Sequence, residues 1–128
     1  MPSPLRNSAL TGRFKLWEYR VGHRQLLLRR CKRDGIPKNF DIMFFNVSYL
    51  DLPAEELEFE VAEPSREDFA VAEARSGEPV APYELFILIC GGRRHMVVAG
   101  NAVYDETDMG AWESPFAIAP KPQNFEGD

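Results

Sequence analysis

Residues 83–104 read YELFILICGGRRHMVVAGNAVY, which is two apolar runs on either side of a Gly-Gly pair. Runs of aliphatic and aromatic residues bounded by glycine are typical of β-strands. Two adjacent glycines allow the positive φ angles that a tight hairpin turn requires. The stretch therefore predicts an antiparallel hairpin with strands at residues 83–90 and 94–104.

The same pattern occurs nearer the N-terminus. Apolar and aromatic residues fill much of 14–21 and 24–31, on either side of Gly22 and His23. Gly22 is expected to supply the positive φ of this turn. Both predicted turns carry arginine and histidine, so the sequence predicts two basic hairpin tips.

Two further strands are predicted between the hairpins. Residues 40–50 form the longest candidate, and their alternation slips around Phe44 and Phe45. Such a slip indicates a bulge or a strand buried on both faces. Residues 57–61 alternate apolar and acidic side chains, as a half-exposed strand does.

One helix is predicted at about residues 65–75. Ser65 can cap its N-terminus, Arg75 suits the last turn, and Gly77 suits the position after the end. Residues 69–72 also alternate as a strand would, so a strand is the alternative.

These elements predict a mainly β fold: a compact antiparallel β-sandwich or partly open barrel of about six to seven strands with one short helix. The length of 128 residues is that of a single domain covering 1–128. Residues 1–10 and 120–128 are expected to be loose tails.

The composition is that of a globular protein, since hydrophobic residues make up 45% of the chain. No apolar run approaches the ~20 residues that span a bilayer. The first residues, MPSPLRNSAL, lack a basic leader followed by an apolar region. We therefore expect a cytoplasmic protein that does not bind membranes, with Cys31 and Cys90 as reduced thiols.

The net charge of −5 is unevenly distributed. Residues 1–38 carry ten Lys and Arg against two acids, a net charge of +8, and the remainder carries −13. Such a split suits either an anionic partner or attraction between the two parts of one fold. The sequence pI near 5.1 disfavours a dedicated nucleic-acid-binding domain, whose pI is usually above about 9.

The chain offers few side chains for catalysis or metal binding. Its two histidines, His23 and His95, lie at or next to the predicted tips, where a general base is poorly held. Together with Cys31 and Cys90 they lack the short ligand spacings of a zinc site. Because a hairpin could still bring Cys90 and His95 together, the folded positions of these four residues decide the question. We predict no catalytic residue, no metal and no cofactor.

The first functional hypothesis is a non-enzymatic interaction module that binds another protein, with an immunity- or inhibitor-like role as one form. A homodimer is compatible with it. The predicted contact residues are those of the two basic tips: His23, Arg24, Arg93, Arg94 and His95.

The alternative hypothesis is a small-molecule-binding β-domain or an enzyme with an aromatic pocket. The residues predicted to line that pocket are Trp17, Tyr49, Phe86 and Trp112. A single-stranded nucleic-acid binder ranks below both hypotheses because of the acidic composition. Its stacking residues would be Trp17 and Tyr19, and its phosphate contacts Arg20, Arg24, Arg29, Arg30, Lys32 and Arg33.

Overall fold

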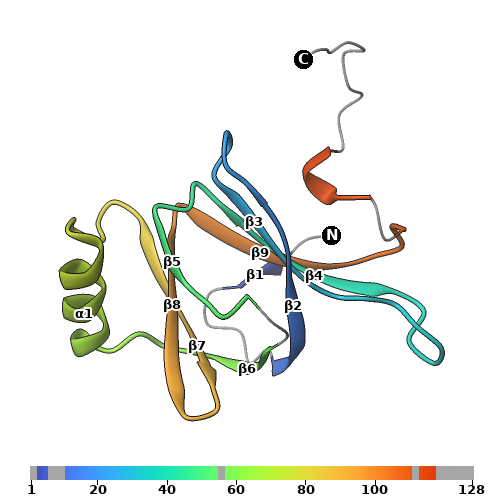
Figure 1. Ribbon diagram of the computed structural model, residues 1–128, viewed down its shortest axis with the longest axis horizontal. Coiled ribbons are helices and arrows are strands. Elements are labelled where there is room, and N and C mark those ends of the chain that lie inside the picture. Colours follow the sequence, from blue (N-terminus) through green and yellow to red (C-terminus); the bar gives the residue numbers. More distant parts are fainter. Residues whose placement is uncertain (1–2, 6–10, 55–56, 111–112, 118–128) are drawn as a thin grey trace.

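The computed structural model describes residues 3–5, 11–54, 57–110 and 113–117. In this part of the chain, antiparallel strands form one sheet, accompanied by a short α-helix and a 3-10 helix (Figure 1). The strands are β1 (Ser3–Pro4), β2 (Thr11–Arg20), β3 (Gln25–Arg30), β4 (Asn39–Phe45), β5 (Tyr49–Asp51), β6 (Leu57–Ala62), β7 (Glu84–Cys90), β8 (Arg93–Ala99) and β9 (Asn101–Thr107). The helices are α1 (Arg66–Ser76) and η1 (Pro115–Ala117).

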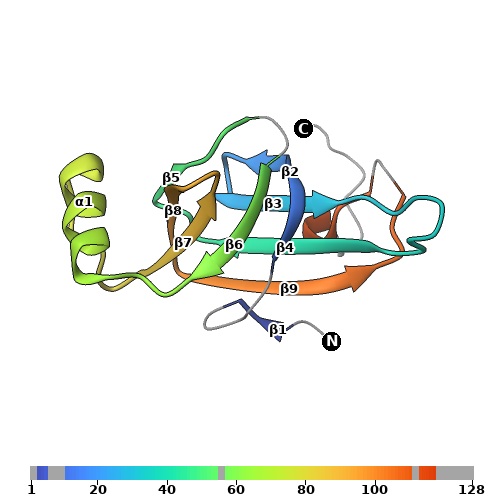
Figure 2. The same cartoon turned by 90° about the horizontal axis from the view of Figure 1, so that it is seen from below.

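The strand order is β1-β9-β4-β3-β2-β6-β7-β8-β5, and the sheet is not closed into a barrel. The predicted mainly β fold is confirmed. The sheet consists of two halves that share β2, whose first residues pair with β6 and whose later residues pair with β3. Figure 2 shows β3, β4 and β9 running side by side, with β6 and β7 inclined to them.

Within the described residues the sheet has nine strands, more than expected, because two predicted strands each break at a corner and β1 adds an edge strand. Residues 40–50 divide into β4 and β5 at Asn46, whose φ is 56°, and residues 94–104 divide into β8 and β9 at Gly100. The Gly100 N–H donates to the carbonyls of Phe45 and Asn46, at 2.9 and 3.2 Å. At Gly100 a Cβ would lie only 3.2 Å from the Cβ of Asn46, so glycine permits this approach. Both corners carry the chain from one half of the sheet to the other.

The main core lies between the two halves. Phe44 of β4 meets Phe86 of β7 edge to face, with ring centroids 5.6 Å apart. Such a ring pair adds about 0.5–1.5 kcal/mol to the effect of burial alone. The buried members of this core are Leu5, Phe14, Leu26, Leu28, Ile42, Phe44, Val47, Phe59, Phe86, Leu88, Val97, Ala99 and Ala102.

The irregular alternation in β4 comes from burial on both faces. Phe44 points into the core, while its neighbour Met43 is also buried although it does not belong to that core. One of the two predicted explanations is therefore confirmed. The register shift lies instead in β2, between Leu16 and Glu18.

Both predicted hairpins are present. In the β7–β8 turn, Gly91 and Gly92 have φ angles of 60° and 79°, as expected. In the β2–β3 turn the positive φ lies at Arg24, at 51°, so its assignment to Gly22 was wrong. Arg24 is the last residue of this turn, and its carbonyl accepts a hydrogen bond from the N–H of Val47, which follows β4, at 2.9 Å. This contact with another part of the chain holds Arg24 in the left-handed conformation.

The predicted helix is confirmed as α1. Ser65 and Asp68 form a capping box at its N-terminus, and Gly77, with φ at 79°, ends it. The helix packs on the outer face of β7, β8 and β5. This second core contains Ala72, Val80, Leu85, Ile87, Met96 and Val98.

A buried ion pair occupies the outer face of the other half of the sheet. Arg29 of β3 lies opposite Asp41 of β4, and both side chains are 0% exposed. Two hydrogen bonds join them, from Nε to Oδ1 at 2.7 Å and from Nη2 to Oδ2 at 3.0 Å. The chain after β9 covers the pair, since Arg29 Nη1 donates to the Glu113 carbonyl at 3.0 Å. Further along β4, Phe116 packs against Phe45, with ring centroids 5.6 Å apart.

Part of the expected N-terminal tail belongs to the sheet. β1 pairs with β9, and the N–H of Leu5 donates to the Ala102 carbonyl at 2.9 Å. Leu5 is fully buried, so its burial draws residues 3–5 onto the fold. The predicted C-terminal tail, 120–128, lies outside the described residues.

Candidate functional site

The two basic tips do not form one surface. His23 and Arg24 lie in the exposed β2–β3 turn, whereas Arg93, Arg94 and His95 open β8 after the β7–β8 turn. Figure 1 shows these turns at opposite ends of the molecule. The five predicted contact residues therefore divide into two separate groups.

Arg94 is exposed, as the sequence predicted, but it also has a structural role. Its Nη2 and Nε donate to the two carboxylate oxygens of Asp68, at 2.7 and 2.9 Å. Asp68 is buried and also accepts from the Ser65 N–H at 2.7 Å. Arg94 thus fastens the N-terminal turn of α1 to β8.

His95 lies beside a second ion pair between the sheet and α1. Arg75 near the end of the helix donates to Asp51 of β5 at 3.0 Å. His95 Nδ1 lies 3.9 Å from Asp51 Oδ1, and the histidine side chain is only 14% exposed. Arg93, the third predicted contact residue of this group, pairs with Cys90 next to the turn and lies exposed.

The Arg94 hydrogen bonds hold the pKa of the Asp68 carboxyl at about 2, below its ordinary value of 3.8, although burial opposes the shift. Because the folded-state pKa is the lower one, this stabilisation is complete above the unfolded pKa and is lost as pH falls through about 2. We expect the stability advantage of the wild type over Asp68→Asn to shrink by about 2 kcal/mol between pH 6 and pH 2. Urea unfolding at several pH values measures it.

The control for this prediction is Glu78→Gln, which removes an exposed carboxylate outside the α1 contacts. It should retain the pH dependence of the wild type in this range. An unchanged stability difference between wild type and Asp68→Asn from pH 6 to pH 2 would contradict the role given to the Arg94 contact.

The cysteines and histidines do not converge on a metal site. His23 and Cys31 flank β3 at opposite ends. Cys90 pairs with Arg93 next to the turn, while His95 pairs with Leu88 further along the hairpin. In the part of the chain that the structure describes, no three metal-ligating side chains form a cluster.

The predicted aromatic pocket is not assembled from its predicted residues. Trp17 lies on the outer face of the sheet, with the Arg29 guanidinium 5.8 Å from its ring centroid. Tyr49 packs against the core under α1, and Phe86 lies in the main core. Trp112 lies outside the described residues.

An open groove follows one edge of β7. β6 pairs with β7 only from Glu60 to Ala62, the last pair being Ala62 with Ile87. Glu63 and Pro64 then lead to α1, since proline has no N–H to continue the ladder. Within the described residues, positions 84–86 of β7 therefore have no strand beside them on the β6 side.

Leu85 directs its backbone groups into this groove. It pairs with Val98 of β8, and the Val98 carbonyl accepts from the Ser48 N–H at 2.8 Å on the β5 side. Adjacent strands alternate between hydrogen-bonded and non-hydrogen-bonded pairs, so Val98 and Leu85 are a non-hydrogen-bonded pair. The N–H and C=O of Leu85 consequently point away from β8, toward the space that β6 has left.

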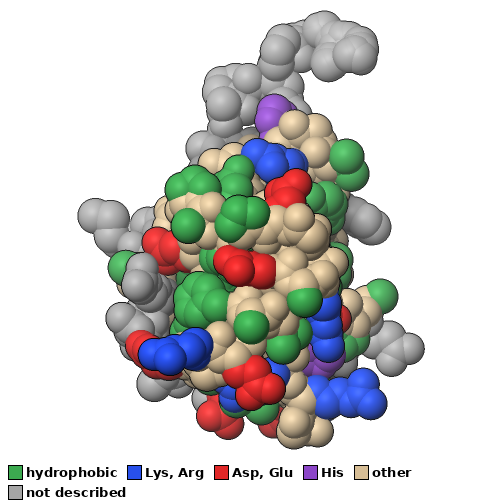
Figure 3. Space-filling view, turned by 90° about the vertical axis from the view of Figure 1, so that its left-hand side faces the viewer, with side chains coloured by type: hydrophobic (Ala, Val, Ile, Leu, Met, Phe, Trp, Pro, Cys, Tyr) green, Lys and Arg blue, Asp and Glu red, His purple; other side chains and the backbone are tan. Residues whose placement is uncertain are grey.

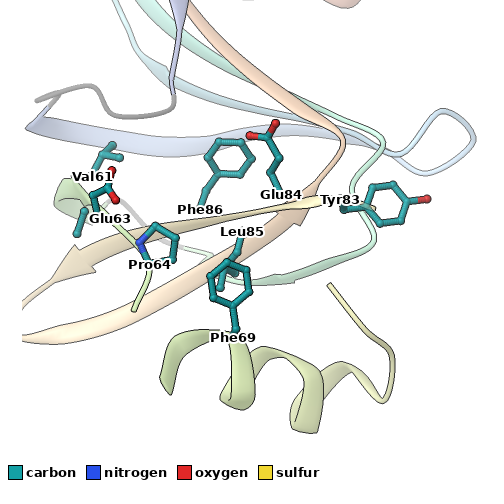
Figure 4. A pocket seen from close by; sticks show the side chains of 9 residues that line it. Val61, Glu63, Pro64, Phe69, Tyr83, Glu84, Leu85 and Phe86 are labelled. Carbon is teal, nitrogen blue, oxygen red and sulfur yellow. The ribbon is translucent and has the colours of Figure 1, made fainter. Parts of the chain in front are cut away.

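The groove has a volume of about 380 Å³. In Figure 4, Phe69 of α1 and Leu85 lie on one side of β7, while Phe86 and Glu84 point to the other side. Figure 3, which looks onto the side that carries α1, shows apolar side chains and carboxylates mixed on this face. The lining residues are Val61, Ala62, Glu63, Pro64, Phe69, Tyr83, Glu84, Leu85 and Phe86. We call this site the β7 groove.

Of the predicted pocket residues that the structure describes, Phe86 alone lines the β7 groove. The remaining lining residues were not predicted as a site. A signal for them exists in the sequence, because Pro64 closely follows a predicted strand and precedes a helix cap at Ser65. That signal predicts where the strand now called β6 ends, but it does not predict that β7 is the strand left without a neighbour there.

No protein-family model, curated protein or solved structure matches this chain. Among the residues described, no helix has the length and apolar character needed to cross a membrane. The functional conclusion therefore comes from the geometry of the sites.

Proposed function

We propose that the protein is a non-enzymatic interaction module whose β7 groove binds an extended segment of another protein. The segment adds a short strand beside residues 84–86, in the space left by β6. It carries lysine or arginine side chains that face the carboxylates of the groove, alternating with small apolar side chains that contact Phe69.

The observation that carries this proposal is the direction of the Leu85 backbone. Its N–H and C=O face the groove, and strand addition would supply partners for both groups. Ordinary side-chain contacts would not use these backbone groups. A backbone donor and acceptor at a gap in a sheet therefore favour an extended peptide over a rounded ligand.

Side chains around the gap supply the specificity. Phe69 is 38% exposed, one of few large apolar side chains that the described residues leave so accessible. Glu63 and Glu84 place two carboxylates in the lining. A volume of about 380 Å³ falls in the range of ligand-binding cavities, about 300–1,000 Å³. The groove thus offers apolar contact and negative charge to one short segment.

A peptide of alternating lysine and valine is the probe for this proposal, and its glutamate–valine counterpart is the negative control. We expect Glu63→Lys to weaken binding of the lysine–valine peptide at least about tenfold, because the reversed charge repels it. Isothermal titration calorimetry measures both affinities.

Glu78→Lys is the matched control, since it makes the same charge change at an exposed position outside the groove. Phe69→Ser should also weaken binding, whereas Val21→Ser, at an exposed apolar residue of the β2–β3 turn, should not. Equal binding of the two peptides, or equal losses in Glu63→Lys and Glu78→Lys, would overturn the proposal. Tighter binding of a small aromatic molecule than of either peptide would favour a metabolite pocket instead.

We also propose that the protein is cytoplasmic. Cys31 and Cys90 are both free thiols, which is compatible with a reducing compartment.

A further inference from the structure

The end of the sheet away from α1 carries a concave basic surface. β2 and β3 are antiparallel, with Lys15 opposite Arg29, so basic residues at the start of β2 lie beside those at the end of β3. A depression of about 250 Å³ lies among them. Its cationic lining consists of Arg13, Lys15, Arg29, Arg30, Lys32 and Arg33. We call it the basic pocket.

Only half of these cations have a carboxylate partner among the described residues. Lys15, Arg30 and Arg33 form no ion pair there, so the six cations and their three acidic partners leave a net charge of +3. The pairs are Arg13–Glu58 at 3.3 Å, Arg29–Asp41 at 2.7 Å and Lys32–Asp108 at 3.2 Å.

Arg30 is held in place without a hydrogen-bond acceptor at its Nε. Its guanidinium carbon lies 5.4 Å from the centroid of the Phe40 ring, a cation–π contact that restrains the side chain. Nε is buried and has no hydrogen-bond partner in the described part of the chain. A restrained cation that forms no ion pair, beside other uncompensated cations, favours an anion.

We propose that the basic pocket binds a small anion that carries phosphate groups. Guanidinium groups match the oxygens of phosphate in geometry as well as in charge. The pocket volume of about 250 Å³ suits one or two phosphate groups rather than a macromolecule. This site is independent of the β7 groove, because the β3–β4 loop and α1 lie at opposite sides of Figure 1.

A nucleic-acid strand would need a continuous basic path, which the described residues of the sheet do not provide. Arg20 donates to the Phe116 carbonyl at 3.1 Å, and Arg24 lies in the β2–β3 turn, at the other end of β3 from Lys32. Arg29 is fully buried in its pair with Asp41. Of the basic residues predicted to contact phosphates, Arg30, Lys32 and Arg33 therefore remain together, and they line the pocket.

Pyrophosphate and adenosine diphosphate are the probes, titrated calorimetrically into the wild-type chain in low salt with sodium chloride matched for ionic strength. We expect pyrophosphate to bind and to raise the melting temperature, as a ligand of the native state must. Lys15→Ala/Arg33→Ala should weaken binding at least about tenfold, because two uncompensated cations are lost. Tighter binding of adenosine diphosphate than of pyrophosphate would also support the proposal, and would assign the phosphates to an organic ligand.

The matched control is Arg24→Ala/Arg93→Ala, which removes two exposed cations from the turns and should retain the wild-type affinity. No binding of either probe, or equal losses in the two double variants, would overturn the proposal. Tighter binding of single-stranded oligothymidine than of pyrophosphate, with affinity that rises with length, would overturn it in favour of nucleic acid.

Discussion

Replacing Asp41 by alanine should lower the free energy of unfolding by about 3–5 kcal/mol, because it leaves the Arg29 guanidinium buried without its carboxylate. Both side chains are 0% exposed, so water cannot compensate for the lost partner in the folded state. Asp41 also accepts from the Thr107 hydroxyl at 3.0 Å, and that hydrogen bond is lost as well. Urea unfolding of the wild type and the variant measures the change.

The double variant Arg29→Met/Asp41→Leu separates the ion pair from the packing around it. Replacing both charges by apolar side chains of similar size should cost less than removing Asp41 alone, since no charge remains buried. Lys32→Met/Asp108→Leu is the exposed counterpart, and it should change stability by about 1 kcal/mol or less. If Asp41→Ala and the exposed double variant had equal costs, the pair would not be buried as described.

Arg29 also connects the sheet to the chain that follows β9. Its Nη1 donates to the carbonyl of Glu113, and further along β4 the ring of Phe116 in η1 packs against Phe45. Loss of Asp41 frees the guanidinium to move, so the covering segment should lose order together with the pair. The ion pair therefore fixes the outer face of one half of the sheet.

The local features of the fold were predictable because their signals are local. Gly91 and Gly92 specify a turn by their own backbone freedom, and Ser65 and Gly77 specify the two ends of α1. The corners at Asn46 and Gly100 were not predicted. The two corners are held together by the hydrogen bonds from the Gly100 N–H to the carbonyls of Phe45 and Asn46, which lie far from it in the sequence. A single glycine in an apolar run does not by itself predict such a corner.

The candidate sites were less predictable, since residue type does not reveal a distant partner. Arg94 is exposed as expected, but its contact with Asp68, at the start of a separate helix, was not predicted. For Arg29 and Asp41 a signal was present, because opposite charges stand inside the apolar runs LLLRR and NFDIMFF. A charged side chain in a strand that is buried on both faces requires a partner of opposite charge. Because β3 and β4 are adjacent in the sheet, Arg29 and Asp41 can be each other's partner.

The β7 groove depends on where two strands separate, which periodicity does not give. Residues 57–61 and 83–90 were both expected to be strands, but their relative register was unknown. Only that register shows that β6 ends at Ala62 and leaves Leu85 facing a gap. The basic pocket likewise could be recognised only from the pairing of β2 with β3, which brings Lys15 opposite Arg29.

The open edge of β7 should be visible in amide hydrogen exchange, as a difference between Leu85 and Ile87. Ile87 shares the orientation of Leu85, but it pairs with Ala62 of β6. Its N–H is therefore hydrogen-bonded, whereas the N–H of Leu85 faces the groove. We expect the Leu85 amide to exchange on the order of 100-fold faster than the Ile87 amide in the free protein.

Exchange in the free protein and with saturating lysine–valine peptide, followed residue by residue by NMR, tests the central claim that β7 accepts an added strand. The account predicts fast exchange at Leu85 in the free protein and slow exchange, close to that of Ile87, once the peptide is bound. Slow exchange at Leu85 without the peptide, or fast exchange that the bound peptide leaves unchanged, would contradict it.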